Sequence, residues 1–179
     1  MTNPIPFSRP VDTRRITESG RVDLITAAAE ECVAIAASFG ILGVKRLEAK
    51  ITLRPWNRVG LELEGRLKAE AVQGCVLTLE PVTERIDHAF SLKFLPPEAT
   101  TADPKTVAEA EVIVEVDAED PPDPLTGPML DLGPVVTEQL ALALDPYPRA
   151  PGAELSAVID PGPDGPSSPF AALSRLKGD

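Results

Sequence analysis

One cysteine and the only histidine of the chain are the residues from which a reaction could be built. Cys75 lies in the stretch Gly74–Val82, and His88 follows shortly after it. A turn centred on Pro81 and Val82 would place these two side chains opposite each other in a hairpin. An imidazole beside a thiol activates that thiol as a nucleophile. The pair therefore predicts, as one alternative, a cysteine-dependent hydrolase.

The same two residues also have a purely structural explanation. His88 falls between Ile86 and Phe90 on the apolar side of an alternating pattern, which is typical of a half-buried histidine in a sheet. No third group that would orient the imidazole can be identified, and nothing in the sequence predicts an oxyanion hole. We therefore expect no catalytic residue and a protein that is not an enzyme.

The sequence predicts no metal or nucleotide site either. Structural zinc needs four Cys or His ligands, commonly from Cys-x-x-Cys pairs. The residue three positions after Cys75 is Thr78, and only Cys32 and His88 remain as further ligands of this kind. The Gly-rich fingerprints of dinucleotide and phosphate sites do not occur. We expect no cofactor and no metal.

Long alternating segments lie on both sides of Cys75. Residues 58–71 place apolar side chains on odd positions and mostly charged ones on even positions, and the alternation returns after Pro81. Period two over this length predicts strands with one buried and one solvated face. Prolines flank one further short strand, which places it at the edge of the sheet. The expected hairpins and edge strand are residues 47–72, 58–95 and 111–116.

Two segments have the periodicity of a helix. The first has apolar positions three or four residues apart, with Asp23 as its N-terminal cap and Gly40 as its stop. The second begins at the cap Asp131 and ends before Pro146, although Leu140–Leu144 taken alone also fits a strand. The predicted fold class is α+β, an antiparallel sheet covered by two helices, residues 22–39 and 131–144.

Composition limits the class of protein. A length of 179 residues and a hydrophobic share of 43% are enough for one domain with a core, which we place at 1–149. Two cysteines make no disulfide framework, which favours reduced thiols in a cytoplasmic protein. The sequence shows no run of eighteen apolar residues and no secretory signal, so we expect no membrane partner.

The net charge of −11 is distributed unevenly. Residues 96–131 hold ten acidic residues, one lysine and many prolines, which predicts a solvated acidic insert in the domain. The overall acidity, with a pI near 4.6, argues against DNA or non-specific nucleic-acid binding. Residues 150–179 read as a flexible tail that ends in a short amphipathic segment. Its apolar side chains are candidates for docking on the domain or on a partner: Phe170, Leu173 and Leu176.

A local basic surface is compatible with the acidic total. The outward positions of the first hairpin carry lysines and arginines interleaved with glutamates. Mixed signs are typical of a solvated sheet face, and the alternative interpretation is a strip that binds phosphate. The candidate residues of this basic face are Arg14, Arg15, Lys50, Arg54, Arg58, Arg66 and Lys68.

Several separated blocks, in order, carry a family resemblance: Gln73–Val82 with Gly65 before it, Phe90–Phe94, parts of Asp131–Arg149, and Pro169–Leu173. Together they resemble the YceD family, the large ribosomal RNA subunit accumulation proteins, in its alphaproteobacterial branch. Some members carry a second cysteine where this chain has Thr78. The resemblance therefore does not extend to a metal or redox role for the motif.

The resemblance implies a bacterial cytoplasmic protein that is needed for 23S rRNA to be made or to persist, in a family with no established catalytic activity. The implied partners are large-subunit rRNA or its precursor and/or basic ribosomal proteins, with the acidic insert screening a basic partner. Our first hypothesis is a noncatalytic ribosome-biogenesis factor. The alternatives are a cysteine-dependent RNA-processing enzyme using Cys75 with His88 and a protein–protein adaptor that docks through its C-terminal segment. The candidate binding motif is the loop with Cys75, Thr78, Leu79, Glu80 and Pro81.

Overall fold

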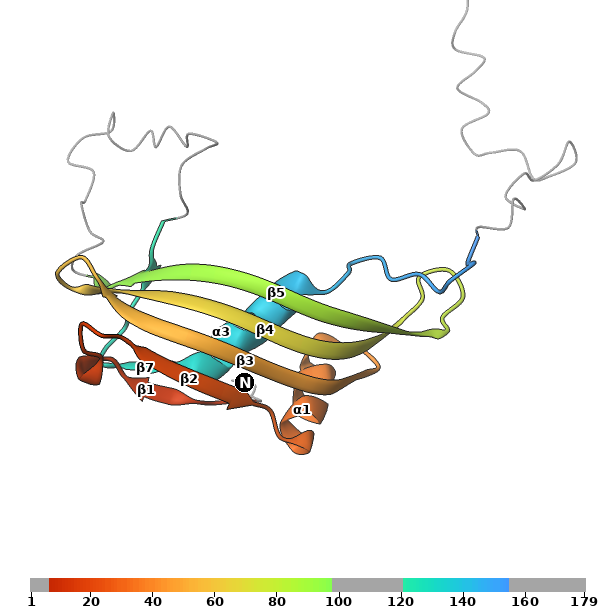
Figure 1. The fold of residues 1–179 in the computed structure, drawn as a ribbon. Coiled ribbons are helices and arrows are strands. Elements are labelled where there is room, and N and C mark those ends of the chain that lie inside the picture. Colours follow the sequence, from red (N-terminus) through yellow and green to blue (C-terminus); the bar gives the residue numbers. More distant parts are fainter. Residues whose placement is uncertain (1–6, 98–120, 155–179) are drawn as a thin grey trace, which may run out of the picture.

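The computed structural model describes residues 7–97 and 121–154 (Figure 1). Two helices, one short 3-10 helix and seven strands are found in these ranges. Their bounds, in chain order, are β1 Pro10–Asp12, η1 Thr13–Arg15, β2 Arg21–Thr26, α1 Ala29–Phe39, β3 Gly43–Trp56, β4 Gly60–Gly74, β5 Pro81–Leu95, β6 Asp123–Pro124, β7 Met129–Asp131 and α3 Leu132–Ala143.

Five strands form one sheet in the order β2-β3-β4-β5-β6, and β1 pairs with β7 in a separate two-stranded sheet. Both predicted hairpins are confirmed: β3 pairs antiparallel with β4, and β4 pairs antiparallel with β5 over almost their full lengths. The β3–β4 connection is tight, with Asn57 at a φ of 55°. Only β6 runs parallel to its neighbour, and it pairs with no more than Phe94 and Leu95. Most of β5 therefore lies at an open edge of the described sheet.

The predicted helix over 22–39 is wrong in its first third. Residues 21–26 form β2, which pairs with β3, and the helix begins only at Ala29. The physical reason is that β2 covers an edge of β3 that would otherwise be open, while it places Ile25 in the core. The expected cap Asp23 instead pairs with Arg21 two residues away on the same strand face, at 2.7 Å. The stop at Gly40 is confirmed by its left-handed φ of 67°.

The alternation of the strands divides the sheet into two different faces. Inward residues such as Leu47, Ile51, Leu63 and Leu67 are fully or almost fully buried. The helices α1 and α3 lie under this inner face, and α3 crosses it diagonally (Figure 1). The other face, called the outer face here, carries the charged positions of β3, β4 and β5. The sheet therefore presents one long solvent-facing surface that is held rigid by the core beneath it.

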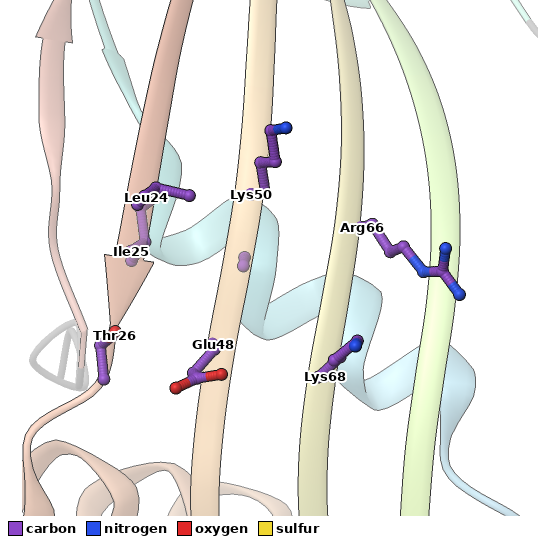
Figure 2. Close-up of a pocket in the computed structure, with 8 residues that line it drawn as sticks. Leu24, Ile25, Thr26, Glu48, Lys50, Arg66 and Lys68 are labelled. Carbon is purple, nitrogen blue, oxygen red and sulfur yellow. The ribbon is translucent and has the colours of Figure 1, made fainter.

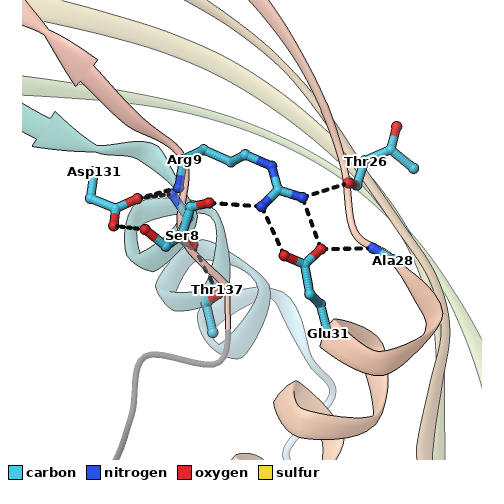
Figure 3. Close-up of polar contacts among 8 residues, drawn as sticks. Ser8, Arg9, Thr26, Ala28, Glu31, Asp131 and Thr137 are labelled. Carbon is cyan, nitrogen blue, oxygen red and sulfur yellow. Dashed lines mark hydrogen bonds and ion pairs between the residues drawn. The ribbon is translucent and has the colours of Figure 1, made fainter.

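The N-terminal arm fixes the start of α3. The Asp131 carboxylate caps the helix by accepting from the Gly133 N–H at 3.0 Å, and it also accepts from the Ser8 hydroxyl at 2.6 Å (Figure 3). The Leu132 N–H donates to the Arg9 carbonyl at 3.0 Å. Phe7, at the beginning of the arm, is buried in the core. The predicted helix over 131–144 and its cap are thereby confirmed.

Arg9 links the arm to the helix α1. Its guanidinium forms a two-point ion pair with Glu31, with both N–O distances at 2.8 Å, and it donates to the Thr26 carbonyl (Figure 3). The Glu31 carboxylate also accepts from the Ala28 N–H at 2.8 Å and so caps α1. Hydrogen bonding to Arg9 lowers the pKa of Glu31. One side chain thus connects β2, α1 and the arm that holds α3.

Parts of the predictions fall outside the described residues. These are the edge strand 111–116, most of the acidic insert 96–131, and the terminal segment with Phe170, Leu173 and Leu176. The last part of the predicted insert, 121–131, carries β6 and β7. Within the described ranges, neither α1 nor α3 has the length and apolar content that crossing a bilayer requires.

Candidate functional site

The loop between β4 and β5 is a six-residue turn anchored at one end of the sheet. Gly74 pairs with Pro81, so the turn consists of residues 75–80, and the expectation that it centres on Pro81 and Val82 is wrong. The Cys75 N–H donates to the Glu80 carbonyl at 2.8 Å, and the Leu79 N–H donates to the Cys75 carbonyl at 2.9 Å. These bonds close the loop on itself and fix its shape.

A second segment, from the end of the described chain, holds the loop from outside. The Val76 N–H donates to the Pro148 carbonyl at 2.9 Å, and the Ala150 N–H donates to the Cys75 Sγ at 3.3 Å. The Gln73 side chain reaches the Asp145 carbonyl at 3.2 Å. Sequence reasoning missed Pro148 and Ala150, because no local pattern connects residues that are more than seventy positions apart.

Cys75 is a buried anchor with an unusual thiol. Its side chain has no exposed surface. Hydrogen bonds to the sulfur from the Thr78 hydroxyl, from the Ala150 N–H, and from the Leu77 and Thr78 N–H groups outweigh desolvation and lower the pKa of Cys75 to about 7. Burial acts in the opposite direction at Cys32, whose pKa is raised. The pKa values of the two buried cysteines are therefore shifted in opposite directions.

We expect the stability of the fold to depend on pH through Cys75. The folded state favours the thiolate, so this contribution is fully present above the ordinary thiol pKa near 9 and is lost as the pH falls through about 7. The difference in unfolding free energy between the natural chain and a Cys75→Ser variant should thus grow from pH 7 to pH 9. Denaturant unfolding at several pH values measures it. A Cys32→Ser variant is the control, and a constant difference for Cys75→Ser would contradict the assignment.

The structure does not bring Cys75 and His88 together. His88 pairs with Leu67 in the middle of the sheet, seven residues along β5 from Pro81. At about 3.4 Å per strand residue this places His88 roughly 23 Å from the loop. The His88 ring stacks on Phe90 with 6.0 Å between the centroids, as the half-buried alternative expected. The pairing on which the hydrolase alternative depended is therefore wrong.

The tip of the loop faces solvent. Thr78, Leu79 and Glu80 are all exposed, and the Thr78 hydroxyl oxygen accepts from the Glu80 N–H at 3.4 Å. Leu79 is 81% exposed and has a φ of 62°, in the left-handed region that costs a residue other than glycine about 1–2 kcal/mol. A strained, exposed leucine contributes nothing to the core. Backbone strain of this kind clusters at active sites and ligand-contacting positions.

A shallow hollow on the outer face gathers part of the predicted basic surface. It has a volume of about 440 Å³ and is lined by residues of β2, β3 and β4 (Figure 2). Register places Lys50 directly opposite Arg66, and Lys68 two residues further along β4, between Glu48 and Asp87. Like charges directly opposite each other on one sheet face are destabilising, so the pairing of Lys50 with Arg66 does not favour the fold. The lining residues are Leu24, Ile25, Thr26, Glu48, Ala49, Lys50, Arg66 and Lys68.

The acidic neighbours of this hollow are already paired with arginines. Glu48 binds Arg46, and Asp87 binds Arg66 at 2.6 and 2.9 Å. Lys50 and Lys68 form no ion pair with any residue in the described part of the chain. Two exposed ammonium groups thus remain available beside the 81%-exposed Leu24, which sequence reasoning had placed inside a helix.

The other predicted basic residues lie elsewhere. Arg54 is further along the outer face, 3.7 Å from Glu64, and Arg58 lies in the β3–β4 turn. Arg14 and Arg15 belong to η1, and both approach the Asp12 carboxylate. No three Cys, His, Asp or Glu side chains among residues 7–97 and 121–154 form a group that could hold a metal.

Comparison with known proteins connects the loop to a family. The family model described as large ribosomal RNA subunit accumulation protein YceD matches residues 63–177, which is more than half of the chain. The chain belongs to the YceD family. Its members are described by the accumulation of the large ribosomal RNA, which is a role in ribosome biogenesis. Searches of the curated proteins and of the solved structures give no match.

The YceD match has a definite position in the fold. It begins within β4 and includes the Cys75 loop, β5, α3 and the Pro148–Ala150 segment that holds the loop. It also includes Arg66 and Lys68 of the hollow, whereas Lys50 and Leu24 precede it. The loop with its anchor thus lies wholly within the family match, and the hollow combines matched residues with residues outside the match.

Proposed function

We propose that this YceD-family chain is a noncatalytic, cytoplasmic factor that supports large-subunit rRNA by binding the RNA backbone in the outer-face hollow. The observation that carries the proposal is that two ammonium groups beside Arg66, those of Lys50 and Lys68, form no ion pair with any described residue. Phosphate is a ligand that would relieve the repulsion between these cations. The noncatalytic part is supported by the burial of Cys75 and by its separation from His88.

The lining of the hollow indicates which part of the RNA it would contact. The residues of the hollow include no aromatic side chain on which a base could stack. Lysine is a flexible point charge that binds phosphate without reading sequence. The exposed Leu24 side chain and the Thr26 hydroxyl could contact the ribose of the RNA backbone. The proposed contact is therefore independent of base sequence and depends on salt.

Binding of a labelled large-subunit rRNA transcript at a series of salt concentrations tests the proposal. Removing both ammonium groups by Lys50→Gln with Lys68→Gln should weaken binding by about tenfold or more at 0.1 M salt. It should also flatten the slope of log K against log salt by roughly 1.4–1.8, the value for two lost phosphate contacts. Both side chains are exposed, so the variant should fold normally.

The matched control is Arg14→Gln with Arg15→Gln, which removes the same charge from η1, where both side chains lie beside Asp12. This variant should keep nearly full affinity. Equal losses in the two double variants would show that only net charge matters, and the hollow would then not be the binding site. An affinity of the natural chain that does not change with salt would overturn the proposal itself.

The exposed loop tip supports a second contact, with a protein component of the assembling subunit. The observation in its favour is the strained and exposed Leu79. Photo-crosslinking groups placed at positions 50 and 79 in living cells separate the two contacts. We expect rRNA attached at position 50 and protein attached at position 79. If RNA is found only at position 79, the roles of the two surfaces must be exchanged.

A further inference from the structure

A groove on the opposite face of the sheet has no occupant among the described residues. It has a volume of about 760 Å³, within the range of ligand-binding clefts. One wall is the edge of β5, including its inward residues His88, Phe90 and Leu92, and the other is α3. The groove is lined by His88, Ala89, Phe90, Ser91, Leu92, Lys93, Pro121, Asp123, Glu138, Gln139 and Leu142.

The topology of the sheet leaves this groove open. Among the described residues, the two-residue β6 alone continues the sheet beyond β5, at Phe94 and Leu95. The helix α3 crosses the sheet diagonally, so its C-terminal half passes under the β5 edge (Figure 1). Leu142 on this half of α3 is 71% exposed. A helix that shows a leucine to solvent next to half-buried aromatic rings has an unpartnered apolar surface.

The absence of a side chain at Gly65 lets the Phe90 ring lie close to the sheet at the floor of the groove. Phe90 pairs with Gly65 across the strands, and the Phe90 ring lies on the Gly65 backbone. A Cβ on residue 65 would meet the Cε1 atom of that ring at 2.7 Å and other ring atoms closer still. The His88 ring stacks with the Phe90 ring at an interplanar angle of 13°. The chain thus presents a preformed aromatic surface.

We propose that the C-terminal segment of this same chain, residues 169–177, docks in the groove between β5 and α3. Phe170, Leu173 and Leu176 are spaced three apart and would supply one apolar face over two helical turns. The segment carries Arg175 and Lys177, and the groove carries two carboxylates, Asp123 and Glu138, against one lysine, Lys93. The charges are therefore complementary on balance. A helix this short is marginal in water and needs such a surface.

The length of chain beyond the described residues is sufficient. The last described residue, Glu154, follows the Pro148–Ala150 segment, which is bonded to the Cys75 loop at the end of β5. The groove begins at His88, roughly 23 Å along the strand from that end. The fifteen residues from 155 to 169 span at most about 50 Å. The YceD match also contains both groove walls and the segment, since it runs to residue 177.

Tethering makes a weak contact effective. A short flexible linker gives an attached segment an effective concentration of about a millimolar, so even a modest affinity keeps the groove occupied. The docking is independent of the proposed RNA contact, because the groove and the hollow lie on opposite faces of the sheet. Failure of one proposal therefore leaves the other intact.

Paramagnetic broadening in the full-length chain tests the docking. A nitroxide is attached to Ala172→Cys in the folded chain, where the two natural cysteines are buried. The natural chain treated in the same way is the control for labelling at those cysteines. We expect loss of the backbone amide signals of residues 88–92 and 139–142, and Leu142→Gln should restore most of them. The matched control Leu42→Gln, also at an exposed leucine, should leave the broadening unchanged. Thermal unfolding of the two variants without the nitroxide should show that both fold.

Three outcomes would overturn the proposal. Broadening confined to residues next to the tail in sequence would show that the segment does not reach the groove. Broadening that appears when spin-labelled chains are mixed with isotope-labelled chains lacking the nitroxide would show that a second copy supplies the segment. Signals in the groove that respond equally to Leu142→Gln and Leu42→Gln would show that the contact is not specific to this surface.

Discussion

Gly133→Ala is expected to destabilise the protein by about 3 kcal/mol, although helix propensity alone predicts a gain of up to about 1 kcal/mol for this change. Gly133 lies in the first turn of α3, where the N-terminal arm crosses the helix. A Cβ on residue 133 would stand 2.8 Å from the Ser8 Cα and closer still to the Phe7 carbonyl. These are backbone atoms and cannot rotate away, so the arm has to move. Movement of the arm exposes Phe7 and weakens the Leu132–Arg9 hydrogen bond.

Urea unfolding of the two glycine variants Gly133→Ala and Gly43→Ala measures this effect against a control. Gly43 in β3 has no atom within 4 Å of the position its Cβ would take, so its replacement should be neutral or slightly stabilising. A loss below about 1 kcal/mol at Gly133 would mean that the arm is held loosely. Asp131 and Arg9 would then not fix the start of α3 as their hydrogen bonds indicate.

The main hairpins were predictable from sequence because their signal is long and redundant. Alternation over more than ten residues leaves one register that buries Leu63 and Leu67 and exposes Arg66 and Lys68. The error at β2 has the same origin. Leu24, Ala28 and Cys32 are four residues apart, and a spacing of four satisfies both period two and period 3.6. Only the open edge of β3, a tertiary feature, decides that residues 21–26 form a strand.

The candidate sites were predictable in composition but not in geometry. Period two placed Lys50, Arg66 and Lys68 on one face, as found. Which cations stay unpaired depends on the pairing of Asp87 with Arg66 and of Glu48 with Arg46, and this follows from rotamers and register rather than from sequence spacing. Likewise the Cys75 loop was found through its residues, while its anchor at Pro148 and Ala150 arises only from the folded chain.

Leu140→Ala is expected to cost about 2–5 kcal/mol, and Leu142→Ala on the same helix less than about 0.5 kcal/mol. Leu140 is completely buried under the sheet, so its truncation leaves a cavity between α3 and the inner face. Leu142 lines the groove outside the core and is 71% exposed among the described residues, so its truncation leaves no cavity beneath the sheet. The pair also decides between the two interpretations of Leu140–Leu144, since positions 140 and 142 share a face in a strand and are about 200° apart in a helix.

The measurement is urea unfolding of both alanine variants beside the natural chain. Equal losses would require residues 140 and 142 to be buried alike, which contradicts the helix and closes the groove. A negligible loss at Leu140 would mean that α3 is not packed on the sheet. The inner face of the sheet would then have no cover at its centre, and the rigidity of the outer face, on which the alignment of Lys50, Arg66 and Lys68 depends, would have no source.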